Sequence, residues 1–495
     1  MLPSDPHDAR LLSTLNPPDW ENPTPAERYN LVVIGGGPAG LIAALGAAGL
    51  GARVALVEKH LLGGDCLNTG CVPSKALLSV AHAAQKARAL QELGITTGPI
   101  QVDFARVMDR MRRIRADISP HDAPGRLRQA GIDVFLGEGR FSGHDAIQIG
   151  THTLRFTKAL VATGASPAMP PIPGLRELAM TNEQLFDLEC LPPRLLVLGG
   201  GVIGCEMAQA FQRMGSQVTV VDLAPRLLSA SSEQASQAIR ERLEKDGVAF
   251  RIGTAIAGLE CVTGGIAGSL TSGEVIVADQ VLAALGRSPN TSLDLDKAGI
   301  LFSKKGIHVD AHLRTTNAQI YACGDVIDGP RFTHAADHQA RMVLQNALFF
   351  GGQLYGSKDP ADLVLPTVVY TQPEIAAVGV SRAQAEQDPA FQIFSAKLEE
   401  SDRGRAEGES GWAHVFADKD GRIHGAEIVA NHAGELIAPI TLAMTHGLGL
   451  SQIASTVHPY PTRSELLFKC ASAWRKTRLP TWAGGVLERF MGWRR

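Results

Sequence analysis

Two stretches of the chain repeat one pattern of apolar, glycine and polar positions. Residues 31–58 read LVVIGGGPAGLIAALGAAGLGARVALVE, and residues 195–222 read LLVLGGGVIGCEMAQAFQRMGSQVTVVD. Each stretch opens with a short apolar run, turns through G-x-G-x-x-G, continues with helix-forming residues and returns to a β-branched run. The pattern predicts two β-α-β units within a doubly wound α/β fold.

The glycines of both stretches fall where a dinucleotide-binding turn needs them. The first makes the tight bend, the second lets the backbone approach a pyrophosphate, and the third lets the helix pack on the strand. They are Gly35, Gly37 and Gly40 in the first stretch and Gly199, Gly201 and Gly204 in the second. Two copies, each with its strand and helix, predict two nucleotide sites rather than two glycine-rich turns.

Each stretch also ends on an acidic residue, Glu58 in the first and Asp222 in the second. A carboxylate at this place accepts hydrogen bonds from the hydroxyl groups of a bound ribose. At Asp222 it favours a nicotinamide dinucleotide without a 2′-phosphate, and therefore NADH over NADPH.

A pair of cysteines, Cys66 and Cys71, lies in the sequence GGDCLNTGCVPSK at residues 63–75. At the start of a helix two such sulfurs can come within bonding distance, and the helix N-terminus favours a thiolate. The alternatives are two structural buried cysteines or half of a zinc site, for which His60 is the one further candidate ligand nearby. We predict a redox-active disulfide.

The composition is that of a globular protein. The chain has 495 residues, 45% hydrophobic and 20% charged, with a formal net charge of −3 that gives no reason to expect a nucleic acid partner. Five of the seven cysteines are scattered in apolar surroundings, as in proteins of a reducing compartment. Residues 1–28 lack the basic and apolar blocks of a signal peptide, so we expect a cytoplasmic protein.

With the cysteine pair, the two nucleotide units and YACGDV at residues 321–326, the chain resembles the FAD-dependent pyridine nucleotide-disulfide oxidoreductases. This family includes dihydrolipoyl dehydrogenase, glutathione reductase and mercuric reductase, and the resemblance covers roughly residues 29–475. It implies a homodimer with an active site shared across the interface. The implied parts are an N-terminal extension (1–28), an FAD-binding domain (29–170 and 290–360), an NAD(P)-binding domain (171–289), an α+β dimerisation domain (361–475) and a basic aromatic tail (476–495).

The resemblance also implies residue roles. Cys71 would lie against the flavin as the charge-transfer thiol, and Cys66 would be the interchange thiol that meets the substrate. Lys75 and Glu206 would form an ion pair beside the flavin, where a cation stabilises negative charge on the reduced ring. The residues expected at FAD are Gly35, Gly37, Gly40, Glu58, Lys59, Gly64, Lys75, Gly139, Thr163, Gly164, Asp325 and Thr333. Those expected at NAD(P) are Gly199, Gly201, Gly204, Asp222 and Gly286.

One departure from the family pattern concerns the base. Lipoamide and glutathione reductases carry a histidine before Pro-Thr, with a glutamate that orients it, whereas here Tyr460 occupies that position and Glu465 is retained. A phenol ionises near pH ~10 and is a poor base at neutral pH. His458 would serve only if the backbone turned it inward, and packing or hydrogen bonding is the plainer role for it. A tyrosine here is similar to mercuric reductase, but the terminal cysteine pair of that enzyme is missing.

These features predict an NAD(P)H oxidoreductase whose Cys66–Cys71 pair reduces a disulfide, another sulfur species or a soft metal ion as substrate. We expect no resident metal. The first alternative is a dihydrolipoyl dehydrogenase acting on lipoyl groups, which Asp222 favours and Tyr460 disfavours. The second is a flavoprotein sensor or scaffold held at a membrane.

The last 22 residues, from Trp474 onward, hold three of the five tryptophans and six basic residues against one acid, Glu488. If this segment is helical, Val486, Leu487, Phe490 and Met491 would share one face. A terminal helix packed on the dimer is one interpretation of this pattern. The other is a helix that lies on the inner surface of the membrane.

Overall fold

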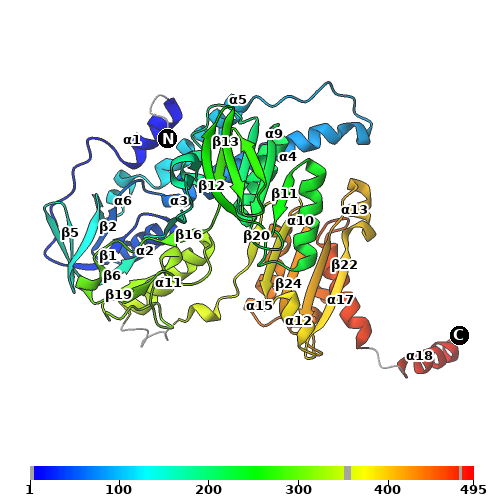
Figure 1. Ribbon diagram of the computed structural model, residues 1–495. Helices are drawn as coiled ribbons and strands as arrows, with labels where there is room; N and C mark the ends of the chain where they lie inside the picture. Colours follow the sequence, from blue (N-terminus) through cyan, green and yellow to red (C-terminus); the bar gives the residue numbers. More distant parts are fainter. Residues whose placement is uncertain (1–4, 350–357, 479–481) are drawn as a thin grey trace. The chain divides into compact units, whose positions relative to one another are not determined.

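The computed structural model describes residues 5–349, 358–478 and 482–495 (Figure 1). These residues form two compact units. The first joins Met1–Pro225 to Asp246–Asp362, and the second joins Arg226–Lys245 to Leu363–Arg495.

The first repeat forms the centre of a seven-stranded sheet. The strand order is β3-β2-β1-β6-β5-β4, with β19 beside β6. Strands β1, β2, β3, β6 and β19 are parallel neighbours, while β4 and β5 add an antiparallel edge. The elements are β1 (Tyr29–Ile34), α2 (Pro38–Gly49), β2 (Val54–Glu58), β3 (Ile132–Leu136), β4 (Gly139–Gly143), β5 (Ala146–Ile149), β6 (His152–Val161) and β19 (Ile320–Ala322).

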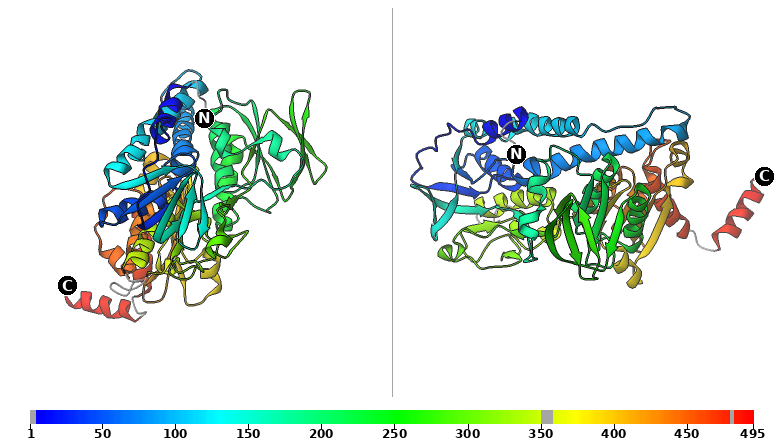
Figure 2. Two further views of the ribbon diagram at one scale, coloured as in Figure 1. Left: turned by 90° about the vertical axis from the view of Figure 1, so that its left-hand side faces the viewer. Right: turned by 45° about the horizontal axis from the view of Figure 1, so that its top comes forward.

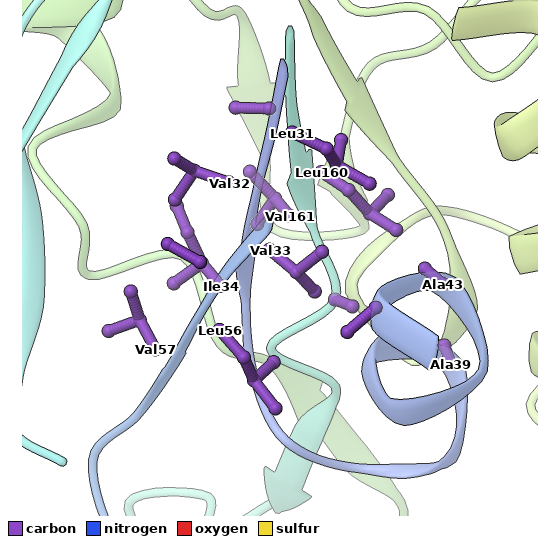
Figure 3. Packing of buried hydrophobic residues seen from close by; sticks show 14 of the residues in the cluster. Leu31, Val32, Val33, Ile34, Ala39, Ala43, Leu56, Val57, Leu160 and Val161 are labelled. Atoms are coloured by element: carbon purple, nitrogen blue, oxygen red, sulfur yellow. The ribbon is translucent and has the colours of Figure 1, made fainter. Parts of the chain in front are cut away.

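The continuous apolar runs of this sheet reflect burial on both faces. Val33 pairs with Leu56 on one side and with Leu160 on the other, and all three are buried. Figure 3 shows these side chains packed beside Ala39 and Ala43 of α2. The small residues of α2 let the helix lie close to the strands.

The second repeat forms an all-parallel sheet of order β11-β10-β9-β15-β8. Its elements are β8 (Ala179–Met180), β9 (Arg194–Leu198), α9 (Val202–Met214), β10 (Gln217–Asp222), β11 (Ala249–Ile252) and β15 (Gln280–Ala283). An antiparallel sheet of β12 (Ile256–Val262), β13 (Gly265–Leu270) and β14 (Val275–Ala278) packs beside it. Both predicted β-α-β units are confirmed.

Short elements and helices complete the first unit. Residues 71–129 contain the helices α4 (Cys71–Arg88), α5 (Phe104–Ile118) and α6 (Pro124–Gln129). The others are α3 (Gly64–Asn68), α7 (Leu175–Leu178), α8 (Asn182–Leu185), α11 (Thr333–Leu348), β7 (Ala165–Pro167), β16 (Arg287–Pro289), β17 (Phe302–Ser303), β18 (Gly306–Ile307) and the 3₁₀ turn η4 (Gly324–Val326).

The described part of the N-terminal extension, residues 5–28, packs within the first unit. Helix α1 (Pro6–Leu15) lies against α5, and Figure 2 shows it in dark blue beside the lighter blue helices. Leu11 and Leu15 are fully buried in the main core. Further along, Asn22 exchanges two hydrogen bonds with the backbone of Leu136 on β3.

The second unit is built on an antiparallel sheet of order β20-β21-β24-β23-β22. The strands are β20 (Thr367–Val369), β21 (Glu374–Gly379), β22 (Gln392–Lys397), β23 (Trp412–Ala417) and β24 (Ile423–Ala430). The helices are α10 (Glu233–Asp246), α12 (Arg382–Gln387), α13 (Asp402–Glu407), α14 (Ala433–Leu436), α15 (Ala438–Thr445), α16 (Leu450–Ser455), α17 (Glu465–Thr477) and α18 (Ala483–Trp493). Its part after residue 362 has the α+β fold that the family resemblance implied, and α10 joins it from an earlier part of the chain.

Candidate active site

The two cysteines lie on consecutive helices. Cys66 is in the short helix α3, and Cys71 is the first residue of α4. The turn into α3 requires glycine, because Gly63 and Gly64 have φ angles of +85° and +56°. A Cβ at Gly64 would lie 2.7 Å from the Cα of Gly37, so α3 passes directly over the start of α2.

Both sulfurs are free thiols in this structure and are hydrogen bonded to each other. That bond raises the pKa of Cys66, and burial raises it further. The pKa of Cys71 falls to about 6, chiefly because Cys66 donates to it, with further help from Thr333 and the Lys75 ammonium. The Thr333 hydroxyl is 3.4 Å from the Cys71 sulfur. At neutral pH the pair therefore holds one proton, on Cys66, and one thiolate, on Cys71.

The ion pair between Lys75 and Glu206 forms. Its N–O distance is 2.9 Å, and the Glu206 side chain is only 3% exposed. Lys75 follows Cys71 by one turn of α4, while Glu206 comes from α9 of the second repeat. The pair thus connects α4 to the second nucleotide unit and brings a cation to the Cys71 thiolate.

The first glycine turn has the geometry of a dinucleotide site. A Cβ at Gly40 would lie 1.8 Å from the carbonyl oxygen of Gly35, so only glycine lets α2 approach β1 this closely. Helix α2 starts at Gly37 without a side-chain cap, which leaves its first N–H groups for an anion. Glu58 accepts hydrogen bonds from the N–H groups of Gly36 (2.6 Å) and His60 (2.7 Å).

A pocket adjoins this turn. It includes the predicted FAD residues Gly35, Glu58, Lys59, Gly139 and Thr163. Residues 289–293 also line it. An acidic residue, an uncapped helix start and an adjoining pocket together fit the adenosine and pyrophosphate portions of FAD.

The second turn repeats this geometry. A Cβ at Gly204 would lie 1.9 Å from the carbonyl oxygen of Gly199, whereas a Cβ at Gly201 would meet nothing within 4 Å. Asp222 accepts hydrogen bonds from the N–H groups of Gly200 and Ala224. Open space beside an uncapped helix start, with a fixed carboxylate nearby, fits a nicotinamide dinucleotide.

Arg287 is a residue that the sequence analysis did not single out. Its guanidinium lies 3.0 Å from the carboxylate of Asp65 in α3 and 3.8 Å from that of Asp325 in η4. Burial raises the pKa of Asp325, while Arg287 opposes that rise. Arg287 follows Gly286 in the motif LAALGRSPN, where an arginine among loop residues is the one sequence signal that would have pointed to it.

Two other predicted glycines lie in turns whose backbone conformation favours glycine. Gly164 and Gly286 have φ angles of +66° and +102°, in a region that L side chains rarely adopt. Gly164 accepts a hydrogen bond from the N–H of Asn290 through its carbonyl, so the two loops that contain these glycines are tied together.

The candidate base residues belong to the second unit. Tyr460 is 71% exposed and donates its hydroxyl proton to Asp402, which raises its pKa. His458 contacts the carbonyl oxygen of Ile453 at 3.2 Å and packs on Phe468. Glu465 starts α17 and pairs with Lys469 at 3.3 Å.

Two family models cover most of the chain. The first, described as pyridine nucleotide-disulphide oxidoreductase, matches residues 29–340, and the second, its dimerisation domain, matches residues 365–470. These matches support the homodimer that the sequence predicted.

Curated relatives and solved structures agree with these matches. The chain is 33% identical over 454 residues to a dihydrolipoyl dehydrogenase of Geobacillus stearothermophilus, covering 89% of this chain and 95% of that one. It is 32% identical over 451 residues to a mercuric reductase of Bacillus cereus, covering 88% and 70%. The solved structure of a Cu(II) complex of the HOCl-induced flavoprotein disulfide reductase RclA from Escherichia coli matches with a TM-score of 0.80 and 27% identity, covering 90% and 100%.

Sequence similarity, fold and site geometry thus agree. Two glycine turns with the geometry expected of dinucleotide sites, a thiol pair and a following dimerisation domain are what is expected of an FAD-dependent enzyme that uses NAD(P)H and acts on sulfur groups. The chain belongs to the pyridine nucleotide-disulphide oxidoreductase family.

Proposed function

We propose that this enzyme uses NADH to reduce, through Cys66 and Cys71, a small disulfide, a related sulfur species or a thiol-binding metal ion. The observation that supports this most strongly is the placement of the two adjacent thiols beside Thr333 and the Lys75–Glu206 ion pair, where the pKa of Cys71 is lowered and that of Cys66 is raised. Bound FAD supplies the two-electron relay between the nicotinamide and the cysteine pair.

The residues of this chain have defined parts in that reaction. Cys66 attacks one sulfur of a disulfide acceptor and releases the first thiol, and Cys71 then attacks Cys66 to release the second thiol and close the Cys66–Cys71 disulfide. The proton that Cys66 must lose has an acceptor within hydrogen-bonding distance, the Cys71 thiolate. Lys75, held by Glu206, would stabilise negative charge near the flavin.

The proton that Cys66 and Cys71 share affects which class of acceptor the enzyme can reduce. A histidine base is replaced by Tyr460, whose raised pKa and donation to Asp402 make it a positioning or proton-donating group. We infer that Tyr460 and Glu465 enter the site from the partner subunit. The acceptor classes follow the relatives, which include a mercuric reductase and a disulfide reductase solved with Cu(II), and a thiolate pair binds soft metal ions well.

Dihydrolipoyl dehydrogenase remains the principal alternative because relatives of that name match over 95% of their length. We expect slow turnover of lipoamide by the native enzyme and a gain of about tenfold or more in Tyr460→His, because a positioned imidazole contributes a factor of this size or larger. Steady-state assays with lipoamide, glutathione disulfide, polysulfide, Cu(II) and Hg(II) measure this. High native lipoamide activity with no gain from histidine would favour the alternative, and Tyr460→Phe is the matched control.

Asp222 supports NADH as the donor. Its carboxylate is fixed by two backbone N–H groups at the end of β10, as expected for recognition of an unphosphorylated ribose. Anaerobic titration with NADH and with NADPH, followed by absorbance of the bound flavin and of the thiolate-flavin complex, compares the two. Rapid multiple turnovers with any acceptor would exclude the sensor or scaffold alternative.

The exposed side chains of the C-terminal helix α18 favour the hypothesis that a membrane surface is a second partner. Trp482, Val486, Phe490 and Met491 are each at least 45% exposed, and Arg489, Arg494 and Arg495 flank them. Among the described residues, no helix is long and apolar enough to span a membrane. We infer that α18 rests on an anionic bilayer through its apolar face.

Truncation tests this partner. We expect the full chain to float with vesicles of phosphatidylglycerol and phosphatidylcholine and the form lacking residues 476–495 to stay in the soluble fraction, because both apolar area and basic charge are lost. Equal flotation of the two forms would exclude a membrane surface as a partner of α18. A variant with Phe490→Ser and Met491→Ser is the matched control that keeps the charge.

A further inference from the structure

The N-terminal extension contributes a buried acid to the first unit. Asp8 on α1 and Arg115 on α5 are both fully buried, and their carboxylate and guanidinium lie 2.7 Å apart. A guanidinium buried without a partner carries a large desolvation cost, so Arg115 depends on a nearby carboxylate. Asp187 adds a second negative charge, and the guanidinium of Arg112 shares Asp8 at 3.6 Å.

Helix α1 is built to deliver Asp8 to this place. Asp5 caps the helix by accepting from the N–H groups of His7 and Asp8 at 2.9 and 3.0 Å. Asp8, Leu11 and Leu15 are the buried residues of α1, and their spacing places them on one face. The two leucines anchor that face in the core, which fixes the depth at which Asp8 enters.

The second terminal nitrogen of the Arg115 guanidinium contacts α3, the helix that contains Cys66. Its Nη1 donates to the carbonyl oxygen of Asn68 at 2.8 Å, and this bond is buried. Asn68 is the last residue of α3, two residues after Cys66. Its side-chain amide in turn donates to the carbonyl oxygens of Gly64 (2.8 Å) and Leu62 (3.1 Å), at the other end of the same helix.

A helix as short as α3 needs such an outside restraint. It has five residues, and it follows two glycines with positive φ angles. The carbonyl groups of its last turn have no partners within the helix, and a guanidinium at that end is also favoured by the helix dipole. The chain from Asp8 through Arg115 to Asn68 therefore fixes the element that holds Cys66.

We propose that Asp8 is a positioning residue for Cys66, which it orients through Arg115 and Asn68. The assignment deepens the proposed function, because it concerns the thiol that would attack the acceptor. Asp8 precedes the first residue matched by the family model, residue 29, whereas Arg115 and Asn68 lie within the match. The N-terminal extension thus adds to the family fold a contact that restrains α3, the helix that contains Cys66.

The first test replaces Asp8 by asparagine in the full-length holoenzyme. We expect iodoacetamide to alkylate Cys66 of the reduced protein about three- to tenfold faster than in the native enzyme, because α3 loses its restraint. Peptide mass spectrometry that locates the label scores Cys66 separately from the Cys71 thiolate, which also reacts. We also expect turnover of the best acceptor to fall by about 10- to 100-fold, as for a misplaced reacting group. The control is Arg10→Ala, which breaks an exposed pair with Asp117 on the same two helices and should change neither rate.

A second variant separates positioning from stability. Asp8→Leu combined with Arg115→Met removes both charges of this pair, and such neutral replacements commonly fold well. Arg112, which also contacts Asp8 at 3.6 Å, keeps its second carboxylate partner, Asp5, at 3.4 Å. This protein still lacks the bond to Asn68, so we expect normal FAD content and the same faster alkylation of Cys66. Alkylation at the native rate in this folded variant would overturn the proposal. Because alkylation needs no acceptor, a failure of the proposed function would show separately, as absent turnover in the native enzyme.

Discussion

Replacing Cys66 by serine is expected to lower acceptor turnover by about 10³-fold or more, because a serine hydroxyl neither attacks a disulfide nor binds a soft metal ion as a thiolate does. The same variant should still be reduced by NADH, since the two dinucleotide sites and the Lys75–Glu206 pair are untouched. Stopped-flow loss of flavin absorbance measures the first half-reaction, and steady-state acceptor reduction measures the whole cycle.

The controls for this prediction use other thiols and the hydrogen bond. Cys190→Ser and Cys261→Ser change exposed cysteines outside the site and should leave both rates unchanged. Cys66→Ala removes the donor that holds the pKa of Cys71 at about 6, so that pKa should rise toward its ordinary value, whereas Cys66→Ser retains a donor. Acceptor turnover above about a tenth of the native rate in Cys66→Ser would contradict the assigned role.

The nucleotide units were predictable because their information is local. Gly35, Gly40 and Glu58 stand within 24 residues of one another. Gly40 meets the carbonyl oxygen of Gly35, and Glu58 accepts from the N–H of Gly36, so both contacts lie inside the same β-α-β unit. The second repeat could be recognised in the same way. Local spacing also placed Cys66 and Cys71 near one another, since the turn between α3 and α4 is short.

Contacts between distant segments were not predictable from the sequence. Asp8 and Arg115 are separated by 107 positions, and no spacing rule relates α1 to α5. Arg287 likewise meets Asp65 from far along the chain. The departure at Tyr460 was visible, but its donation to Asp402 depends on how α13 is placed, which no local pattern encodes.

A single methyl group on Gly204 is expected to impair the second nucleotide unit severely. The Cβ of Gly204→Ala would lie 1.9 Å from the carbonyl oxygen of Gly199, so α9 must move away from β9 by about 1 Å to reach an acceptable contact. Overpacking of this kind costs about 1–3 kcal/mol, and here the displaced helix start is also the expected pyrophosphate site. We expect kcat/KM for NADH to fall about 100-fold and the melting temperature to drop by several degrees.

The same displacement should reach α4, because Glu206 follows Gly204 by two residues and holds Lys75 of α4 at 2.9 Å. The pKa of Cys71 should therefore rise, since the ammonium that lowers it loses its anchor. Gly201→Ala is the matched control, for its Cβ meets nothing within 4 Å and α9 can stay in place. It should raise the KM for NADH while leaving the melting temperature and the Cys71 titration near native values. If Gly204→Ala behaved like Gly201→Ala in thermal melts and thiol titration, close packing of α9 on β9 would not be what couples the nucleotide unit to the thiol pair.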